Sequence, residues 1–451
     1  MLEKKVNQSN ENGDALKNTF VTWKKQKGWS PLTIVSAEGA YFTDSSGKRY
    51  LDFSSQLMCS NLGHGDRKII EAIEKQAEKL PYIAPSFNTD VRNDVARKLR
   101  EILPENLTKY FFGTAGTEAN EAAVKIARMF KAKDHKTKIF SFYNSYHGAT
   151  LSSIHLTGDF RRIQVDSFHE AAGFLHLAPP FCYRCPFGLK YPDCSMACVK
   201  NVEYAIKNEG NVAALFLEPV TGTNGIVVPP KEFLPAIREI TEKYGVLLVA
   251  DEVMTGFGRT GEWFAVDHWG VKPDILTAAK GITGAYAPLS ITAVNSEIAE
   301  YFEDNYFAHG HTYSSHPLML AAASAAIDEY REKKILEHVR ELAPYFMKWL
   351  EDLKERHISV GDVRGIGLFG AVELVKNRET REPFNTYQEK ISGKQLVVNR
   401  VAQRAMLNGV FINTWISHFI IAPPLIIRKE ELDEGFRVLD EALKIADKEV
   451  L

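Results

Sequence analysis

The sequence predicts an α/β protein with two domains: a large domain built on a mostly parallel sheet, and a smaller α+β domain formed from both ends of the chain. Five short apolar runs alternate with helical patterns, at residues 109–113, 138–143, 213–218, 245–252 and 274–279. Buried strands separated by helices are typical of a parallel sheet that helices cover on both faces. The 451 residues are also enough for two domains.

The other elements follow in order along the chain. Residues 34–55 alternate apolar and polar side chains around a turn at 44–47, which predicts β-hairpins. Residues 66–103 have a helical pattern, and the chain beyond Pro317 is mostly helical with strand-like segments at 368–375 and 419–425. We therefore expect residues 1–60 to be the N-terminal part of the small domain, 61–316 the large domain, and 317–451 the C-terminal part of the small domain.

Charge and composition narrow the class of protein. The 55 basic and 57 acidic side chains give a formal charge of −2, which argues against a nucleic-acid-binding protein. No stretch approaches the roughly 20 apolar residues that span a bilayer, and the polar N-terminus does not resemble a signal or transit peptide. Five cysteines, an odd number, fit a reducing compartment. These features predict a cytoplasmic protein without membrane contact.

Ligands of open α/β sheets bind beyond the C-terminal ends of the strands, so functional residues are expected directly after the five runs. After the first run, TAGTEANEAAVKIA opens a helix whose free N–H groups suit an anion. Gly116 allows close backbone approach there and Thr117 adds a hydroxyl, although an ordinary N-cap turn has the same composition. After the second run, Tyr146 could stack on a planar ligand beside His147, or fill the core.

Carboxylates and one lysine end the later runs. Glu218 ends the third run, Asp251 ends the fourth, and Lys280 follows the fifth in the small-residue stretch TAAKGITGAYAPL. Buried carboxylates need a cationic partner, so Asp251 and Lys280 could form a structural ion pair. A pyridoxal cofactor is the alternative, because it needs a lysine imine, an acidic partner for its ring nitrogen and a phosphate site.

The ordered motifs GTAGTEANEAAVKIAR, YHGAT, FLEPV, LLVADEVMTGFGRTG, AAKGITGAYAPL and HGHTYSSHPL resemble those of the class III, or ω-type, aminotransferases. These are fold type I enzymes that use pyridoxal 5'-phosphate (PLP). The resemblance extends from about Ile34 to Leu439. It implies a homodimer with shared active sites, with a tetramer as the alternative assembly.

The resemblance also implies roles for single residues. Lys280 matches the Schiff-base lysine that shuttles a proton, and Asp251 matches the partner of the pyridine nitrogen. The other implied cofactor contacts are Gly116 and Thr117 at the phosphate, Tyr146 and Val253 on the two ring faces, His147 close by, Glu218 near the cofactor hydroxyl, and Thr312 at the phosphate of the neighbouring subunit.

The implied reaction moves an amino group from a donor to a 2-oxo acid, pyruvate or 2-oxoglutarate. Ile420 stands where ornithine- and 4-aminobutyrate-type relatives often carry an arginine, and Ala149 stands where ornithine-type relatives read HGRT. The segment 51–66 is more like the branch acting on taurine, β-alanine, 4-aminobutyrate or simple amines. Residues expected near the substrate are Ser55, Gln56, Leu57 and Arg364, the last with a structural salt bridge as its alternative role.

Two further functions stay open: an amino-acid racemase or aminomutase on the same fold, and a non-enzymatic protein that kept the fold. Intact motifs around Lys280 and Asp251 argue against the second.

A cysteine cluster, Cys182, Cys185, Cys194 and Cys198, has spacing compatible with zinc or an iron–sulfur site, but also with disulfides or reduced thiols. The predicted chemistry requires no metal.

Overall fold

The computed structural model describes residues 18–165 and 172–450, and its centre is a seven-stranded sheet in the order β4-β10-β9-β8-β7-β5-β6. The strands are β4 (Leu107–Gly113), β5 (Lys138–Phe142), β6 (Phe174–Leu177), β7 (Val212–Leu217), β8 (Leu247–Asp251), β9 (Ile275–Ala278) and β10 (Ser290–Asn295). Only β10 runs antiparallel to its neighbours. The predicted mostly parallel sheet is confirmed; β6 and β10 are the strands that the sequence did not predict.

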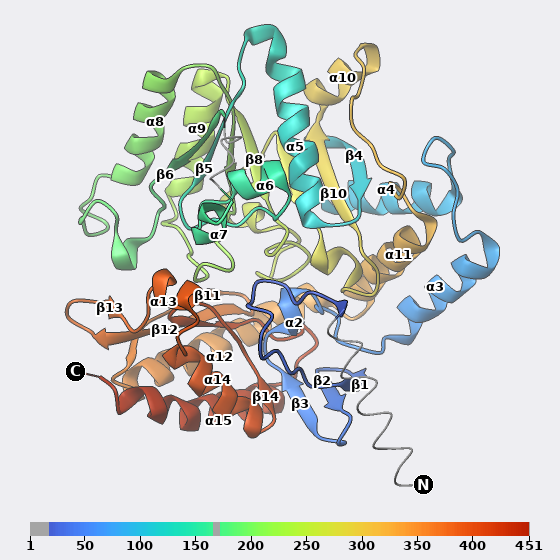
Figure 1. The fold of residues 1–451 in the computed structure, drawn as a ribbon. Coiled ribbons are helices and arrows are strands. Elements are labelled where there is room, and N and C mark those ends of the chain that lie inside the picture. Colours follow the sequence, from blue (N-terminus) through green and yellow to red (C-terminus); the bar gives the residue numbers. More distant parts are fainter. Residues whose placement is uncertain (1–17, 166–171, 451) are drawn as a thin grey trace.

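Helices cover both faces of this sheet (Figure 1). They are α5 (Gly116–Lys131), α6 (Leu151–Leu156), α7 (Phe160–Ile163), α8 (Ala197–Glu209), α9 (Phe233–Tyr244) and α10 (Ser296–Asp304). Adjacent residues of β8 face opposite layers: Leu248 packs in one apolar cluster with Ile237 of α9, and Val249 in another with Ala127 of α5. Because both faces are covered, every residue of β7 and β8 is buried, which explains why both strands are apolar up to Asp251 at the end of β8.

The two ends of the chain meet below the large sheet in Figure 1. Strands β1 (Ile34–Glu38), β2 (Tyr41–Asp44) and β3 (Arg49–Asp52) form the predicted hairpins, and β3 pairs with β14 (Val410–Phe411). A second small sheet contains β11 (Val360–Ile366), β12 (Phe369–Asn377), β16 (His418–Ile421) and β15 (Asn413–Thr414), with β13 (Glu382–Pro383) beside β12. The division of the chain at residues 60 and 316 stays a prediction.

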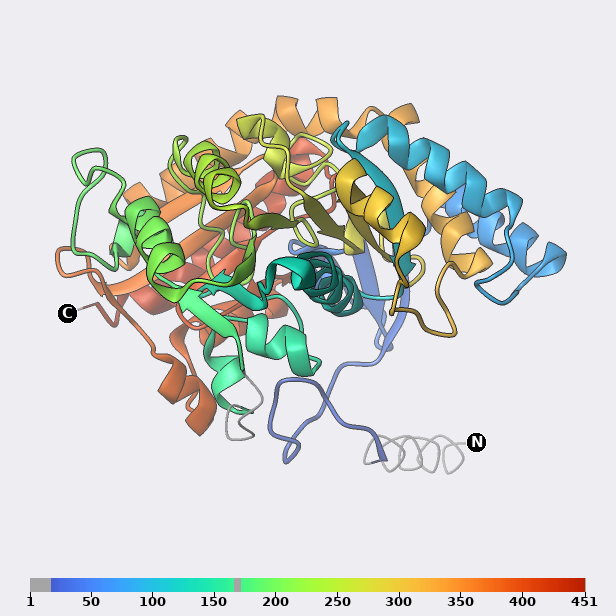
Figure 2. The ribbon, with the colours of Figure 1, turned by 90° about the horizontal axis from the view of Figure 1, so that it is seen from above.

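The remaining helices surround these sheets. They are α2 (Ser55–Met58), α3 (Arg67–Lys79), α4 (Asp90–Ile102), α11 (Pro317–Glu332), α12 (Ile335–Arg356), α13 (Tyr387–Ser392), α14 (Val397–Leu407) and α15 (Lys429–Asp447). Seen from above, the blue helices α3 and α4 lie toward one end of the molecule, and the green helices α8 and α9 toward the other (Figure 2). Teal α5 lies between them.

Arg259 fastens the loop after β8 to both chain ends. Its buried guanidinium donates from Nη1 to the carbonyl oxygens of Leu368 (3.0 Å) and Pro423 (2.6 Å). Its Nη2 donates to Ser55 Oγ (3.1 Å) and Asn61 Oδ1 (2.9 Å). This loop follows Asp251, the last residue of β8. The four hydrogen bonds of Arg259, called the Arg259 clamp below, therefore hold the loop against the C-terminal layers.

Within the described ranges, no helix is both long and apolar enough to cross a membrane. Residues 1–17, which contain most of the polar N-terminus, lie outside the described part of the chain.

Candidate active site

A cavity of about 480 Å³ opens at the C-terminal edge of the large sheet. Its walls come from the loops that follow β4, β5, β7, β8 and β9, the same five runs after which the sequence predicted functional residues. Eight residues predicted to contact the cofactor line it together: Gly116, Thr117, Tyr146, His147, Glu218, Asp251, Val253 and Lys280. The sheet therefore collects at one point side chains that lie up to 164 positions apart in the sequence.

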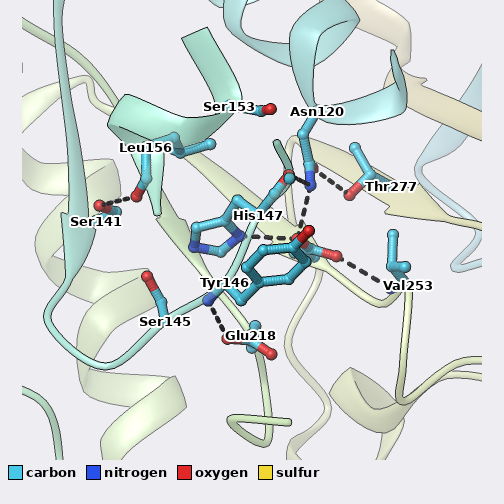
Figure 3. A network of polar contacts seen from close by, with 12 residues as sticks. Asn120, Ser141, Ser145, Tyr146, His147, Ser153, Leu156, Glu218, Val253 and Thr277 are labelled. Carbon is cyan, nitrogen blue, oxygen red and sulfur yellow. Dashed lines mark hydrogen bonds and ion pairs between the residues drawn. The ribbon is translucent and has the colours of Figure 1, made fainter. Parts of the chain in front are cut away.

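Both carboxylate oxygens of Asp251 take part in a polar network with His147, Asn120 and Val253, which Figure 3 shows. Its Oδ2 lies 2.7 Å from His147 Nδ1 and accepts from Asn120 Nδ2 at 2.8 Å, while Oδ1 accepts from the Val253 N–H at 3.0 Å. The side chain is 3% exposed, so these bonds replace the water that the carboxylate loses on folding. The carboxylate is thus oriented by protein groups, and its remaining lone pairs stay available to a cation in the cavity.

Asn120 and Thr277, which were not predicted from the sequence, complete this network. Asn120 also donates to the His147 carbonyl oxygen at 2.8 Å, and its Oδ1 accepts from Thr277 Oγ1 at 2.8 Å. Thr277 lies opposite Asp251 in the pairing of β8 with β9. The only available signal was their position: Asn120 is one turn inside the helix after the phosphate-like loop, and Thr277 precedes Lys280 by three residues.

Lys280 begins a short 3-10 helix directly after β9 and has φ +49°, a left-handed conformation that costs energy for a residue with a side chain. The next residue must be glycine, because a Cβ at Gly281 would lie 2.5 Å from Asn61 Nδ2 and 2.8 Å from Phe257 Cβ. Loss of hydration in the cavity lowers the pKa of Lys280, and the charge of Arg161 lowers it further. Both effects favour the neutral amine, the form that can act as a base or nucleophile.

The first turn of α5 points its backbone into the cavity. Its N-cap residue, Ala115, makes no side-chain cap, so the leading N–H groups of the helix are left for a ligand. Gly116 lies close to Val253, because a Cβ at Gly116 would lie 2.8 Å from Val253 Cγ1. This helix start, with the hydroxyl of Thr117, fits an anion such as a phosphate.

Glu218 holds two loops of the cavity wall. Its Oε1 accepts from the Tyr146 N–H (3.0 Å) and its Oε2 from the Gly222 N–H (2.8 Å). Desolvation is the largest cause that raises the pKa of Glu218, to about 7. The group is therefore close to changing its charge near neutral pH.

The residues expected near the substrate lie outside this cavity. Ser55 is buried, where it donates to the Ala422 carbonyl oxygen and accepts from Arg259; Gln56 donates to Asp52; Leu57 is 67% exposed. Arg364 donates to the Gly225 carbonyl oxygen and pairs with Asp362 (2.8 Å) and Glu373 (2.6 Å), as in its alternative, structural role.

Thr312 also lies away from the cavity of its own subunit, on the surface, where its carbonyl oxygen accepts from Tyr82 at 3.1 Å. Its predicted contact with a neighbouring subunit stays a prediction.

The cysteine cluster consists of free thiols, with Cys182 exposed and the other three partly exposed. Cys182 lies in a short 3-10 helix and Cys198 in α8, with an irregular loop between them. Among residues 18–165 and 172–450, no three His, Cys, Asp or Glu side chains are arranged to hold a metal ion. The metal hypothesis therefore receives no support from the geometry.

The cavity fits PLP on its own chemistry. It combines an amine with a lowered pKa, a buried and oriented carboxylate, an aromatic face at Tyr146 and an uncapped helix start.

Comparisons with known proteins show the family of the chain. The family described as Aminotransferase class-III matches residues 23–443. A leucine/methionine racemase of Thermococcus litoralis is 37% identical over 92% of this chain and 91% of its own. The putrescine–pyruvate aminotransferase of Pseudomonas aeruginosa is 34% identical over the same shares, 92% and 91%.

Among solved structures, a taurine:2-oxoglutarate aminotransferase from Bifidobacterium kashiwanohense, in complex with PLP and glutamate, is 36% identical. It aligns with a TM-score of 0.92 over 98% of this chain and 99% of that one. Together with the cavity, these findings show that the chain belongs to the class III aminotransferases, PLP-dependent enzymes of fold type I that act on an amino donor and a 2-oxo acid.

Proposed function

We propose that the protein transfers the terminal amino group of an ω-amino acid, of the taurine, β-alanine or 4-aminobutyrate type, to pyruvate or 2-oxoglutarate. The donor leaves as an aldehyde and the acceptor as an amino acid, so the amino group and the carbonyl oxygen are exchanged without a net oxidant. One observation supports transamination most strongly: a single cavity is lined by Lys280, Asp251 and the start of α5.

PLP, when bound, supplies an electron sink for the electron pair left on the donor carbon. Asp251, oriented by His147 and Asn120, would keep the ring nitrogen protonated. The Lys280 amine would hold the cofactor covalently and then carry the proton from the donor carbon, a role that its lowered pKa supports.

The other predicted contacts would bind different parts of the cofactor. Gly116 and Thr117 would receive the phosphate, and Tyr146 and Val253 would enclose the ring. Glu218 would set the position of Tyr146 through its backbone N–H.

One similar solved structure and the residue at position 420 bear on the substrate class. The similar solved structure is named a taurine:2-oxoglutarate aminotransferase. Ile420, at the position of the arginine of ornithine- and 4-aminobutyrate-type relatives, is 2% exposed in an apolar cluster with Met58 and Met254. No guanidinium therefore enters the site from that position, so the chain departs there from both the ornithine-type and the 4-aminobutyrate-type relatives, whereas Ala149 departs from the ornithine type alone.

A donor panel tests this proposal. The purified holoenzyme is incubated with taurine, β-alanine, 4-aminobutyrate, ornithine or putrescine, each with pyruvate and with 2-oxoglutarate, and the amino acid formed is quantified. Formation of alanine or glutamate with the anionic ω-amino acids is expected. Preferred use of ornithine or putrescine would contradict the proposed donor class.

Racemisation is the second candidate, favoured by the leucine/methionine racemase that is 37% identical to this chain. A racemase needs no acceptor, whereas a transaminase consumes one. L-leucine and L-methionine without a 2-oxo acid are therefore the discriminating substrates, followed by chiral chromatography. Loss of enantiomeric purity without an acceptor would favour racemisation over the proposed transfer.

We also infer a homodimer that shares its active sites. Tyr82 and Tyr313 are 40% and 57% exposed, and Tyr82 contacts both Tyr313 and Thr312. An aromatic surface around the predicted inter-subunit threonine supports burial against a second copy. Light scattering after size-exclusion chromatography should give a dimer mass, and a monomer would contradict the shared site. Location in the cytoplasm stays a prediction from the sequence.

A further inference from the structure

Arg161, at the start of the short helix α7, lies among aromatic rings beside the active-site cavity. Its guanidinium carbon is 3.7 Å from the ring centroid of Tyr146, 4.5 Å from that of Trp415 and 5.4 Å from that of Trp23. The side chain is only 7% exposed. Because Tyr146 also lines the cavity with Lys280, Arg161 stands one ring away from the reacting amine.

One nitrogen of this guanidinium is left over. Nε donates to both carboxylate oxygens of Asp159 (2.9 and 3.1 Å), and Nη2 pairs with the same carboxylate. Nη1 forms no hydrogen bond with any residue in the described ranges. Stacked rings cover the faces of a guanidinium but leave its edge open, so Nη1 can donate in the plane to an incoming anion.

The residues that contact Arg161, Asp159 and Trp415, are joined to each other by hydrogen bonds through Asn224. Asp159 Oδ2 accepts from Asn224 Nδ2 at 3.1 Å, and Asn224 Oδ1 accepts from Trp415 Nε1 at 2.8 Å. These bonds connect the loop after β7 with the C-terminal layers and fix the ring of Trp415. Arg161 is therefore part of a built site and not a mobile surface cation.

A second cation lies beside these residues. Lys390 Nζ, in α13, is 4.6 Å from the Trp415 ring centroid, and no carboxylate of the described residues forms an ion pair with it. Burial lowers the pKa of Lys390, and the nearby charges of Arg161 and Lys24 lower it further. Arg161 is thus paired with a single carboxylate, Asp159, and Lys390 adds an unpaired positive charge beside the same Trp415 ring, so the local field attracts an additional anion.

We propose that Arg161, assisted by Lys390, binds the distal carboxylate or sulfonate of the amino donor while the donor amine reaches the cavity at Lys280. This inference rests on the proposed function, since it names the residues that select an anionic ω-amino acid. It also predicts a preference against a diamine, whose distal ammonium would meet like charges.

The test compares donors that differ in their distal charge. Arg161→Gln, Arg161→Lys and Lys390→Gln are measured with taurine and β-alanine and with the uncharged n-propylamine as donors. Loss of a charge-assisted hydrogen bond should raise KM for the anionic donors roughly 10- to 100-fold in Arg161→Gln, with a smaller change in kcat. The n-propylamine KM should stay the same or fall, and Arg161→Lys should restore part of the lost affinity. Arg437→Gln, at a 71% exposed arginine of α15, is the matched control.

A binding readout separates recognition from catalysis. Trp23 and Trp415 border Arg161, so ethanesulfonate, which has no amine, should change the tryptophan fluorescence of the wild-type holoenzyme in a saturable way. The same titration should give a weakened response in Arg161→Gln and in Lys390→Gln.

Equal losses for anionic and uncharged donors, or an unchanged ethanesulfonate titration, would overturn the role of Arg161 and leave the proposed function standing. If wild-type enzyme does not use anionic donors at all, the proposed donor class fails first. If Arg161→Gln cannot be isolated with its cofactor, the Arg161→Lys and Lys390→Gln variants decide the question by the same split between donors.

Discussion

At the scale of single residues, Lys280 unites two properties that rarely occur together: a strained backbone and an amine whose pKa is lowered by its surroundings. We expect Lys280→Ala to lose the visible absorbance of bound cofactor and its fixation by borohydride. Transaminase activity should fall roughly 100- to 10,000-fold, because the variant lacks the proton-transfer group.

Lys348→Ala, at an exposed lysine of α12, is the control for removing a positive charge. Activity in Lys280→Ala close to that of this control would exclude Lys280 as the cofactor lysine.

Glu252, next to Asp251, gives a prediction about pH. It is fully buried, its Oε1 accepts from the Val266 N–H at 2.8 Å, and desolvation raises its pKa from 4.5 to about 7. A raised carboxyl pKa means that the folded protein binds this proton more tightly than the unfolded chain. Its contribution to stability is therefore complete below pH 4.5 and is lost as pH rises toward 7, by up to roughly 3 kcal/mol.

Glu252→Gln keeps the shape and an acceptor for Val266 but has no proton to lose. Urea midpoints from pH 4.5 to 7 should consequently fall more in the wild type than in the variant. Parallel pH dependence of the two proteins would contradict the raised pKa.

At the scale of elements, the start of α5 must approach the loop after β8 closely. Gly116→Ala would place a Cβ 2.8 Å from Val253 Cγ1, and Val253 is β-branched and stiff. Relieving this clash should displace the helix start at a cost of about 1–3 kcal/mol, so we expect PLP affinity to fall roughly tenfold. Fluorescence titration of the apoprotein with PLP measures the change.

Gly310→Ala is the control, because a Cβ there meets no atom within 4 Å. The double variant Gly116→Ala/Val253→Ala should recover part of the affinity, since the clashing methyl groups are gone. Strictly additive losses would show that the contact does not cause the defect.

At the scale of the whole molecule, Arg259 joins the loop after β8 to segments from both chain ends. Arg259→Leu would leave four buried acceptors without their donor, the carbonyl oxygens of Leu368 and Pro423 and the side-chain oxygens of Ser55 and Asn61. We expect a destabilisation of roughly 3 kcal/mol or more. The thermal midpoint of unfolding measures this destabilisation, and Arg437→Leu, at an exposed arginine, is the control. Equal midpoints for the two variants would show that the Arg259 hydrogen bonds contribute little to stability.

Much of the fold was predictable because its strands are buried on both faces. The runs at β7 and β8 are continuously apolar before Asp251, so no alternation was needed to recognise them. Strand β10 was missed because Ser290 and Thr292 interrupt its apolar pattern, although Thr292 is buried and donates to the Ala119 carbonyl oxygen. Strand β6 was missed because its four residues are mostly half-exposed.

The sequence by itself determined the family, the order of the strands along the chain and which residues follow them, because motifs and apolar runs are local properties of the chain. Only the tertiary structure decided that Asn120 and Thr277 orient Asp251, since that contact depends on the register of β8 and β9 and on the position of α5. It also decided that Ser55 belongs to the Arg259 clamp, and that Arg161 lies under the ring of Tyr146. These contacts join residues distant in sequence, and their energy exists only after the layers have packed.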